Sequence, residues 1–186
     1  MTTFDLTNHF LIAMPTMADP NFSKSVTYVC AHNDDGAMGI VINRPMDLNL
    51  GEIFAQMDIE RVADETNEQP IYQGGPVHQD RGFIIHCPAT QWDSTIHVTD
   101  ELAVSTSRDI LQAMSAGDGP RDTLVALGYA GWGAGQLEHE MGQNAWLSGP
   151  ANAEIIFRTA AAQRWETAAA TMGVDLSSLS SDIGHA

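Results

Sequence analysis

Short apolar runs separated by turn-forming residues fill the first third of the chain and restrict most strongly what it can fold into. Three runs, FLIAMP, SVTYVCAH and AMGIVINRP, are rich in β-branched and other apolar residues, as strands are. The residues between them include DPNF and NDDG, compositions that are typical of turns. Because tight links join antiparallel rather than parallel neighbours, the sequence predicts three antiparallel strands here.

The remainder of the chain adds more strands than helices. Helical spacing or composition predicts helices at 50–57, at 107–117 with Ser107 as cap and Gly117 as terminator, and over TAAAQRWETAAATMG with Gly173 as terminator. The acidic segment 60–69 is predicted as a solvated loop or turn, or as a short helix over 61–65. Further strand-like runs are PIYQGGPV, RGFIIHC, STIHVTDELAVSTS, DTLVALGYAG, AWLSGP and AEIIFR.

These elements predict an α+β fold, because strands and helices do not alternate strictly along the chain. The length of 186 residues fits one domain, and no repeat or linker composition interrupts it. The sequence therefore predicts a single domain over residues 1–186.

Charge is the most unusual bulk property of the chain. It carries 24 Asp and Glu against 8 Lys and Arg, a formal net charge of −16. Nucleic acids and anionic membrane surfaces would repel such a chain, so direct binding to either is not expected. The N-terminal apolar patch lacks a cationic region before it and is too short to span a membrane. Two cysteines are too few for a disulfide scaffold, and we expect a cytoplasmic protein.

The segment LGYAGWGAGQLEHEMGQN, residues 127–144, combines glycines with an acidic helix start. A dinucleotide fingerprint fails there, because Gly131 and Gly133 are followed at the third position by Gln136. No Gly-Lys-Ser or Gly-Lys-Thr phosphate loop occurs in the chain. The adjacent run 138–140, Glu-His-Glu, cannot converge on one ion, since neighbours on a helix point about 100° apart. We expect its carboxylates to be solvated near a helix N-terminus, and we predict neither metal nor cofactor.

No complete catalytic arrangement is found in the sequence. The chain lacks a Gly-x-Ser-x-Gly motif, and His86 and Cys87 would point to opposite faces of a strand. A non-enzymatic protein is therefore favoured. Redox sensing through Cys30 or Cys87 stays open as an alternative; it would require an exposed thiol of low pKa, although both residues lie in apolar runs.

Two of the few arginines stand at strand ends beside Gly or Pro turns. If these turns meet, Arg44 and Arg81 with the amides of glycines 74 and 75 would form an anion pocket, to which the glycines at 131 and 133 could contribute. Structural pairing of the arginines with carboxylates is the competing interpretation. The ligand-binding hypothesis thus comprises Arg44, Arg81, Gly74, Gly75, Gly131 and Gly133.

Four sequence blocks, three long and one short, resemble the YqgE/AlgH family over nearly the whole chain. They are LIAMPTMADPNFSKSVTYVCAHNDDGAMGIVINRP, YQGGPVHQDRGFIIH, ALGYAGWGAGQLEHEMGQNAWL and the closing GHA. The resemblance implies a bifurcated, mostly antiparallel sheet folded into a pseudo-barrel with flanking helices, in which GYAGWGAGQLE joins a core strand to a helix. It also implies a link to transcriptional regulation, a label that derives from one member connected to alginate gene expression, with no established enzymatic activity or cofactor.

Nothing in the sequence resembles a helix-turn-helix with a basic recognition helix. The leading hypothesis is therefore a cytoplasmic regulator that acts indirectly, through a protein partner or a small ligand, and not by binding DNA. Its rivals are a binder of, or an enzyme acting on, a small anionic ligand and a thiol-based redox sensor. The sequence leaves the oligomeric state open.

Overall fold

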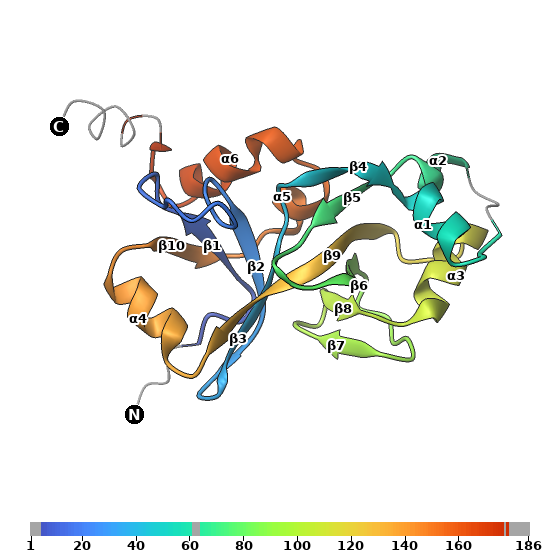
Figure 1. Cartoon of the computed structure of the whole chain (residues 1–186), viewed down its shortest axis with the longest axis horizontal. Coiled ribbons are helices and arrows are strands. Elements are labelled where there is room, and N and C mark those ends of the chain that lie inside the picture. Colours follow the sequence, from blue (N-terminus) through green and yellow to red (C-terminus); the bar gives the residue numbers. More distant parts are fainter. Residues whose placement is uncertain (1–4, 61–63, 177, 179–186) are drawn as a thin grey trace.

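A long, curled sheet forms the body of the protein, and helices cover its two ends (Figure 1). The computed structural model describes residues 5–60, 64–176 and 178, and ten strands lie within them. The strands are β1 (His9–Ala13), β2 (Val26–Asn33), β3 (Gly36–Val41), β4 (Pro45–Asn49), β5 (Pro70–Gln73), β6 (Val77–Cys87), β7 (Thr95–His97), β8 (Ala103–Ser105), β9 (Asp122–Gly133) and β10 (Trp146–Pro150).

The first three strands pair antiparallel, as predicted. β1 pairs with β2 through Leu11 and Thr27, and β2 pairs with β3 through Tyr28 and Ile40. The path through the sheet runs β10-β1-β2-β3-β9-β6-β8-β7, and β5 pairs parallel with β9 off this path. The sheet is therefore mostly antiparallel.

Strand β9 is the point at which the sheet divides. Its C-terminal half pairs with β3, where Gly131 lies opposite Met38. Its N-terminal half pairs with β5 through Val125 and Ile71, and with β6 through Val125 and Ile84. One long strand thus pairs with β3 at one half and with both β5 and β6 at the other, which confirms the predicted bifurcation and gives the sheet its curled, half-barrel form.

The helices sit at both ends of the sheet (Figure 1). Three of them, α1, α2 and α3, gather at one end, α4 lies beside β10 near the other, and α6 contacts β1 and β2. Their bounds are α1 (Leu50–Gln56), α2 (Asp64–Asn67), α3 (Arg108–Ala116), α4 (Gln136–Gly142), α5 (Ala153–Phe157) and α6 (Arg164–Ala170), with a 3₁₀ turn at Ala161–Gln163 before α6.

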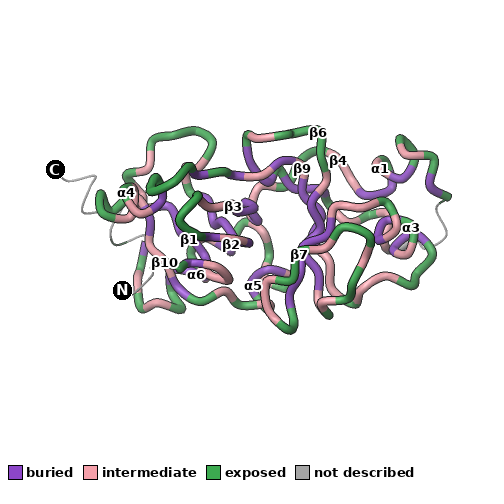
Figure 2. Tube along the Cα trace, turned by 90° about the horizontal axis from the view of Figure 1, so that it is seen from below, coloured by how far each residue is buried: buried purple, intermediate pink, exposed green. Residues whose placement is uncertain are grey.

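Alternation along the strands sends side chains into different cores. On β1, Phe10 and Ile12 enter the largest core, whereas Leu11 and Ala13 enter a second core under α4. On β9, Val125 instead joins a third core formed with α1 and α3. Figure 2 shows that the buried stretches follow the strands and that the outer loops are exposed. The two-residue period of a strand explains how one sheet serves cores on both faces.

The predicted strand AEIIFR is wrong, because this segment forms α5. Asn152 caps the helix by accepting a hydrogen bond from the backbone N–H of Glu154 (2.8 Å). The neighbouring pair Ile155 and Ile156 is buried in the helix. A short apolar run is compatible with either structure, so the cap decides between them.

Other helix predictions hold with shifted ends. The helix predicted at 50–57 is α1, and the one predicted at 107–117 is α3, which ends at Gly117 with a φ of +85°. Ser107 stands at the N-cap, but its hydroxyl donates to Asp109 (2.5 Å) and accepts from the amide of Ser94 (3.0 Å), and it caps no amide of the helix. In the acidic segment, 61–63 lie outside the described residues and a short helix covers Asp64–Asn67.

None of the helices within the described residues is both long and apolar enough to cross a membrane.

Candidate functional site

The acidic helix start at residues 138–140 is built into the fold. Nε2 of His32, on β2, lies 2.6 Å from Oε1 of Glu138. Oε1 of Glu140 accepts the indole N–H groups of Trp132 (3.2 Å) and Trp146 (3.0 Å). Both tryptophans are buried, and their rings meet edge to face with centroids 6.1 Å apart. The carboxylates therefore fasten α4 to the sheet. The Glu138 side chain is still 38% exposed in the first turn of the helix, so the expectation of solvated carboxylates holds only in part.

Gly74 and Gly75 are packed against the backbone of β9. The amide of Gly74 donates to the carbonyl of Leu127 (2.8 Å), so it is not open to a ligand. A Cβ at Gly74 would lie 2.4 Å from the carbonyl oxygen of Gly128, and one at Gly75 would lie 2.1 Å from the carbonyl carbon of Tyr129. These two glycines allow two segments to approach closely.

The guanidinium group of Arg44 forms hydrogen bonds within the protein. It donates to the backbone carbonyls of Asn21 and Ser23, the second at 2.7 Å. Burial lowers the pKa of Arg44, and the Asp19 carboxylate counteracts this effect. The contacts of its guanidinium therefore give it a structural role, fastening the loop before β2.

Arg81 lies elsewhere, over the ring of Phe83 (5.8 Å to the centroid). It lines a hollow of about 270 Å³ that also includes Tyr129. Tyr129 also lines a neighbouring hollow of about 550 Å³ with Gly131. The structure thus places Arg81 and Gly131 on adjoining hollows, whose linings do not include Arg44. Gly133 is exposed. Its amide N–H donates to Oε1 of Gln136 (2.9 Å), so it is not available to a ligand.

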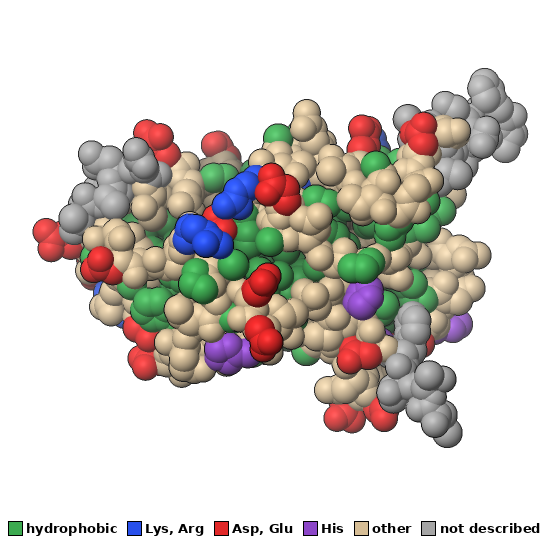
Figure 3. Space-filling model, turned by 180° about the vertical axis from the view of Figure 1, so that it is seen from behind, with side chains coloured by type: hydrophobic (Ala, Val, Ile, Leu, Met, Phe, Trp, Pro, Cys, Tyr) green, Lys and Arg blue, Asp and Glu red, His purple; other side chains and the backbone are tan. Residues whose placement is uncertain are grey.

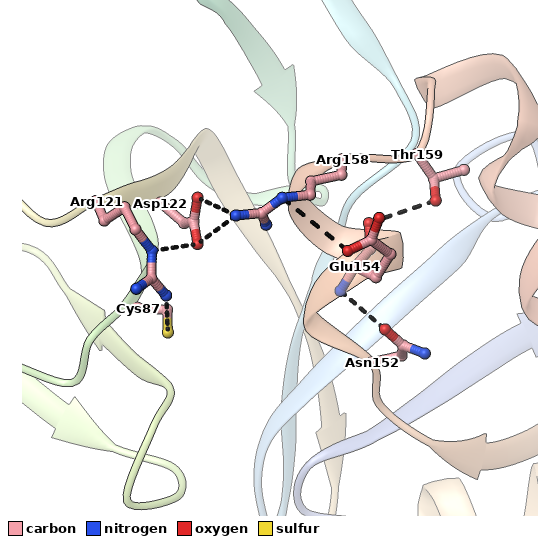
Figure 4. Close-up of polar contacts among 7 residues, drawn as sticks. All are labelled: Cys87, Arg121, Asp122, Asn152, Glu154, Arg158 and Thr159. Carbon is pink, nitrogen blue, oxygen red and sulfur yellow. Dashed lines mark hydrogen bonds and ion pairs between the residues drawn. The ribbon is translucent and has the colours of Figure 1, made fainter.

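The two cysteines have different surroundings. Cys30 is buried in β2, and burial raises the pKa of its thiol to about 12. Cys87, at the end of β6, is partly exposed, and Nη2 of Arg121 lies 3.5 Å from its Sγ (Figure 4). A thiolate is the reactive form of cysteine. Cys87 is accordingly the thiol that a redox role would require.

A cleft of about 330 Å³ lies between α1, α3 and the strands β6 and β9. Gly82 opens it, because a Cβ at that position would meet no atom within 4 Å. The third core lies directly behind, so the floor is continuous with packed apolar side chains. The apolar lining comes from α1 and the residue that follows it, from α3 and from both strands: Ile53, Met57, Leu111, Ile84, Val125 and Leu127.

Polar groups stand around this apolar floor. Asp80 and Arg108 bring opposite charges, and Nη2 of Arg108 donates to the carbonyl of Met57 (2.6 Å), linking α3 to the end of α1. Gln56 contributes an amide, and hydroxyl groups come from Thr106 and Ser107. An apolar pocket with a few convergent polar groups is the usual form of a small-molecule site.

A second, more polar hollow of about 290 Å³ contains two arginines that the sequence prediction missed. Arg121 and Arg164 both line it, together with Asp122. Asp122 accepts from Arg121 Nε (3.2 Å) and from Arg158 Nη2 (3.4 Å), and Figure 4 shows both arginines pointing toward it. On the face of the molecule seen in Figure 3, most of the visible Lys and Arg surface lies together at one place. This gathering is unusual in a chain with a net charge of −16.

The sequence offers few signals that would indicate Arg121 and Arg164 as site residues. Arg164 lies inside the most regular predicted helix, and Arg121 stands in a short Gly-Pro-Arg-Asp link, far from it along the chain. Gly82 carried the one available signal, because a glycine inside a strand often marks a place where something else approaches closely.

The curled half-barrel sheet with helices at both ends defines the class: an α+β protein with hollows formed between its strands and its flanking helices. A family model described as AlgH-like matches residues 10–177, and the chain belongs to this family.

Relatives of known sequence match nearly end to end. A UPF0301 protein of Thioalkalivibrio sulfidiphilus is 58% identical over 182 residues, which are 98% of this chain and 97% of the relative. A UPF0301 protein of Nitrosococcus oceani is 54% identical over 179 residues, 96% of each chain.

Solved structures agree with the fold. The solution structure of the AlgH protein from Pseudomonas aeruginosa is 49% identical, with a TM-score of 0.81 over 96% of this chain and 95% of that one. A crystal structure of a Corynebacterium diphtheriae protein shares the fold at 18% identity, with a TM-score of 0.69 over 90% of this chain and 87% of that one.

Proposed function

We propose that this chain is a non-enzymatic regulatory protein that acts indirectly. It binds a small molecule with an apolar body and a polar head in the cleft between α1, α3 and the sheet. The bound form then affects gene expression in the cytoplasm through a protein partner and not through contact with DNA.

The observation that carries this proposal is the combination of size and lining in the cleft. Its volume of about 330 Å³ falls at the lower end of the range of about 300–1,000 Å³ that small-molecule pockets occupy. Burial of an apolar body against the cleft floor supplies roughly 25 cal/mol per Å². The rim groups, above all Asp80 and Arg108, give the head of the ligand its orientation.

Charge supports the indirect mode of action. Most non-specific affinity for DNA comes from cations that displace counterions, whereas this chain has 8 cations against 24 acidic residues. The regulatory part of the proposal rests on the resemblance of the four sequence blocks to a family with that link. A ligand that bridges α1 and α3 changes the surface that both helices present to a partner.

Gly82 offers a direct test. In Gly82→Val the new side chain fills the cleft without meeting an atom within 4 Å at its Cβ, so the protein should fold normally. Gly142→Val is the matched control, because its Cβ also meets nothing within 4 Å and it lies at the end of α4, away from the cleft.

The measurement is the melting temperature in the presence of hydrophobic amino acids, aromatic acids and short fatty acids. A compound that stabilises the wild type and Gly142→Val but not Gly82→Val supports the proposal, with about 2.7 kcal/mol expected at a hundredfold excess over the Kd. Stabilisation that survives in Gly82→Val contradicts it. Sequence-specific DNA binding tighter than micromolar at near-physiological salt also contradicts it.

A further inference from the structure

The strongest unexplained feature outside the cleft is a buried arginine that has no acidic partner among the described residues. Arg164 is 5% exposed. Nε of Arg164 donates to the carbonyl of Thr159 (2.9 Å), and Nη1 donates to the carbonyl of Ile42. Its guanidinium lies over the ring of Tyr72, 5.1 Å from the centroid. Among the residues that the structure describes, no carboxylate lies within ion-pair distance of it.

A buried charge without a counter-ion is costly, and buried cations are normally paired. The missing partner is more unusual here, because the chain has three times as many acidic as basic residues. A guanidinium has five N–H donors. The two carbonyls use two of them, and no acceptor within the described ranges takes the other three.

The three remaining N–H donors belong to Arg164, which lines a hollow instead of being packed on all sides. The hollow of about 290 Å³ is also lined by Arg121, whose side chain is 68% exposed at the mouth, and by the polar side chains of Gln69 and Thr123. Thr123 Oγ1 donates to Oε1 of Gln69 (3.2 Å), so the amide NH₂ of Gln69 is left for another acceptor.

Asp122 does not cancel the positive charge of this hollow. Its carboxylate is shared by Arg121 and Arg158, at 3.2 and 3.4 Å. Arg158 also approaches Glu154 at 4.0 Å (Figure 4). Within the described part of the chain, these two carboxylates pair with Arg121 and Arg158 and not with Arg164. The positive charge of Arg164, in the wall of the hollow, is therefore left uncompensated.

We propose that this hollow binds a small oxyanion, a phosphate or carboxylate group, between Arg121 at its mouth and Arg164 in its wall. Arginine presents parallel N–H donors that match the oxygen spacing of both groups. The site differs from the anion pocket expected from Arg44 and Arg81, and it is separate from the apolar cleft.

The test uses the full chain with inorganic phosphate and, separately, succinate, each compared with sodium chloride at the same ionic strength. The chloride arm is needed because any salt screens the self-repulsion of an acidic chain. We expect at least one of the two oxyanions to raise the melting temperature in the millimolar range beyond the effect of chloride.

Arg121→Ala is the informative variant, because this exposed side chain can be removed without opening the core. It should weaken the apparent affinity for the oxyanion at least fivefold. Arg81→Ala is the matched control: it removes the same charge at another exposed site, and should leave the affinity within twofold. Gly82→Val should also leave it unchanged, which separates this site from the cleft.

Arg164→Lys keeps the charge but removes the planar fork, and it should weaken oxyanion binding while the circular dichroism spectrum stays native. If that variant does not fold, Arg121→Ala still decides the question. Equal stabilisation by chloride, no stabilisation by either oxyanion, or a response lost in Arg81→Ala and kept in Arg121→Ala would each overturn the proposal.

Discussion

Nε2 of His32 lies 2.6 Å from Oε1 of Glu138, and this contact joins β2 to α4. On the other side of the ring, Nδ1 accepts the backbone N–H of Leu6 (2.9 Å). Since an amide N–H can only donate, the proton of the neutral ring sits on Nε2 and is donated to the carboxylate. One imidazole thereby holds together the N-terminal segment, a core strand and the helix that follows the glycine-rich segment.

Removing the carboxylate should therefore loosen α4. We expect Glu138→Ala to lower the free energy of unfolding by about 1 kcal/mol, because a buried ring N–H loses its acceptor. For a chain of this size that corresponds to a fall of roughly 2–4 °C in Tm. Glu138→Gln keeps an acceptor oxygen and should cost less. Glu154→Ala, which removes a 69% exposed carboxylate from a 4.0 Å ion pair, is the control; an equal loss there would count against a special role for Glu138.

The glycines predicted as ligand-binding residues should separate into two groups. A Cβ at Gly75 would lie 2.1 Å from backbone atoms of Tyr129, at a φ of +156°, whereas a Cβ at Gly131 would come no closer than 3.4 Å to the Tyr129 ring. We expect Gly75→Ala to destabilise the protein by roughly 3 kcal/mol or more. Gly131→Ala should change stability by less than about 1 kcal/mol. Urea unfolding measures both, and similar losses would show that the close approach is not what selects glycine.

The sequence predicted the parts of the fold that depend on local pattern. Antiparallel pairing of the first strands, the α3 terminator at Gly117 and the strand before the glycine-rich segment follow from turns, caps and alternation. The α5 helix was missed because the five residues from Ala153 to Phe157 are too few to show a helical period.

The candidate sites were less predictable, because they depend on which distant segments meet. Arg44 and Arg81 stand beside similar turns in the sequence, yet the fold directs one to backbone carbonyls and the other to a hollow. Arg121 and Arg164 line one hollow because the residue before β9 and the first residue of α6 meet there, beside Tyr72 of β5. No spacing rule relates these positions.

The two thiols should react at very different rates. Burial raises the pKa of Cys30 to about 12, whereas Cys87 is partly exposed and has a guanidinium nitrogen 3.5 Å from its sulfur. Since only the accessible thiolate reacts, we expect iodoacetamide at pH 8 to modify Cys87 at least tenfold faster than Cys30 in the native protein. Mass spectrometry of the digested protein measures both rates, and labelling in urea should equalise them. Comparable native rates would contradict the assignment.

Arg121→Ala extends this experiment to the redox alternative. If the guanidinium stabilises the Cys87 thiolate, the variant should be labelled more slowly at that position, while labelling of Cys30 stays the same. An unchanged rate at Cys87 would remove the physical basis for a redox role of this pair.

His86 is a fully buried titratable group with a defined proton position. Its Nδ1 lies 2.9 Å from the carbonyl of Pro88, so Nδ1 carries the proton, and Nε2 lies 2.8 Å from Oγ of Ser105, from which the neutral ring accepts. Burial lowers the pKa of His86; the hydrogen bond to Pro88 acts in the opposite direction, and His97 lowers it further. The folded protein thus binds this proton less readily than the unfolded chain.

Stability should consequently fall as the pH drops below about 6.5, the pKa of an unperturbed histidine in the unfolded chain. The contribution of His86 is fully present above that pH and is lost progressively until its lower folded pKa is reached. Urea unfolding between pH 5 and 7.5 measures the slope, in a range above the pKa of ordinary carboxyl groups. We expect His86→Gln to have a smaller slope than the wild type, whatever its stability at pH 7.5. His139→Gln, which replaces an exposed histidine on α4, should keep the wild-type slope, and the opposite pattern would show that another group governs the pH dependence.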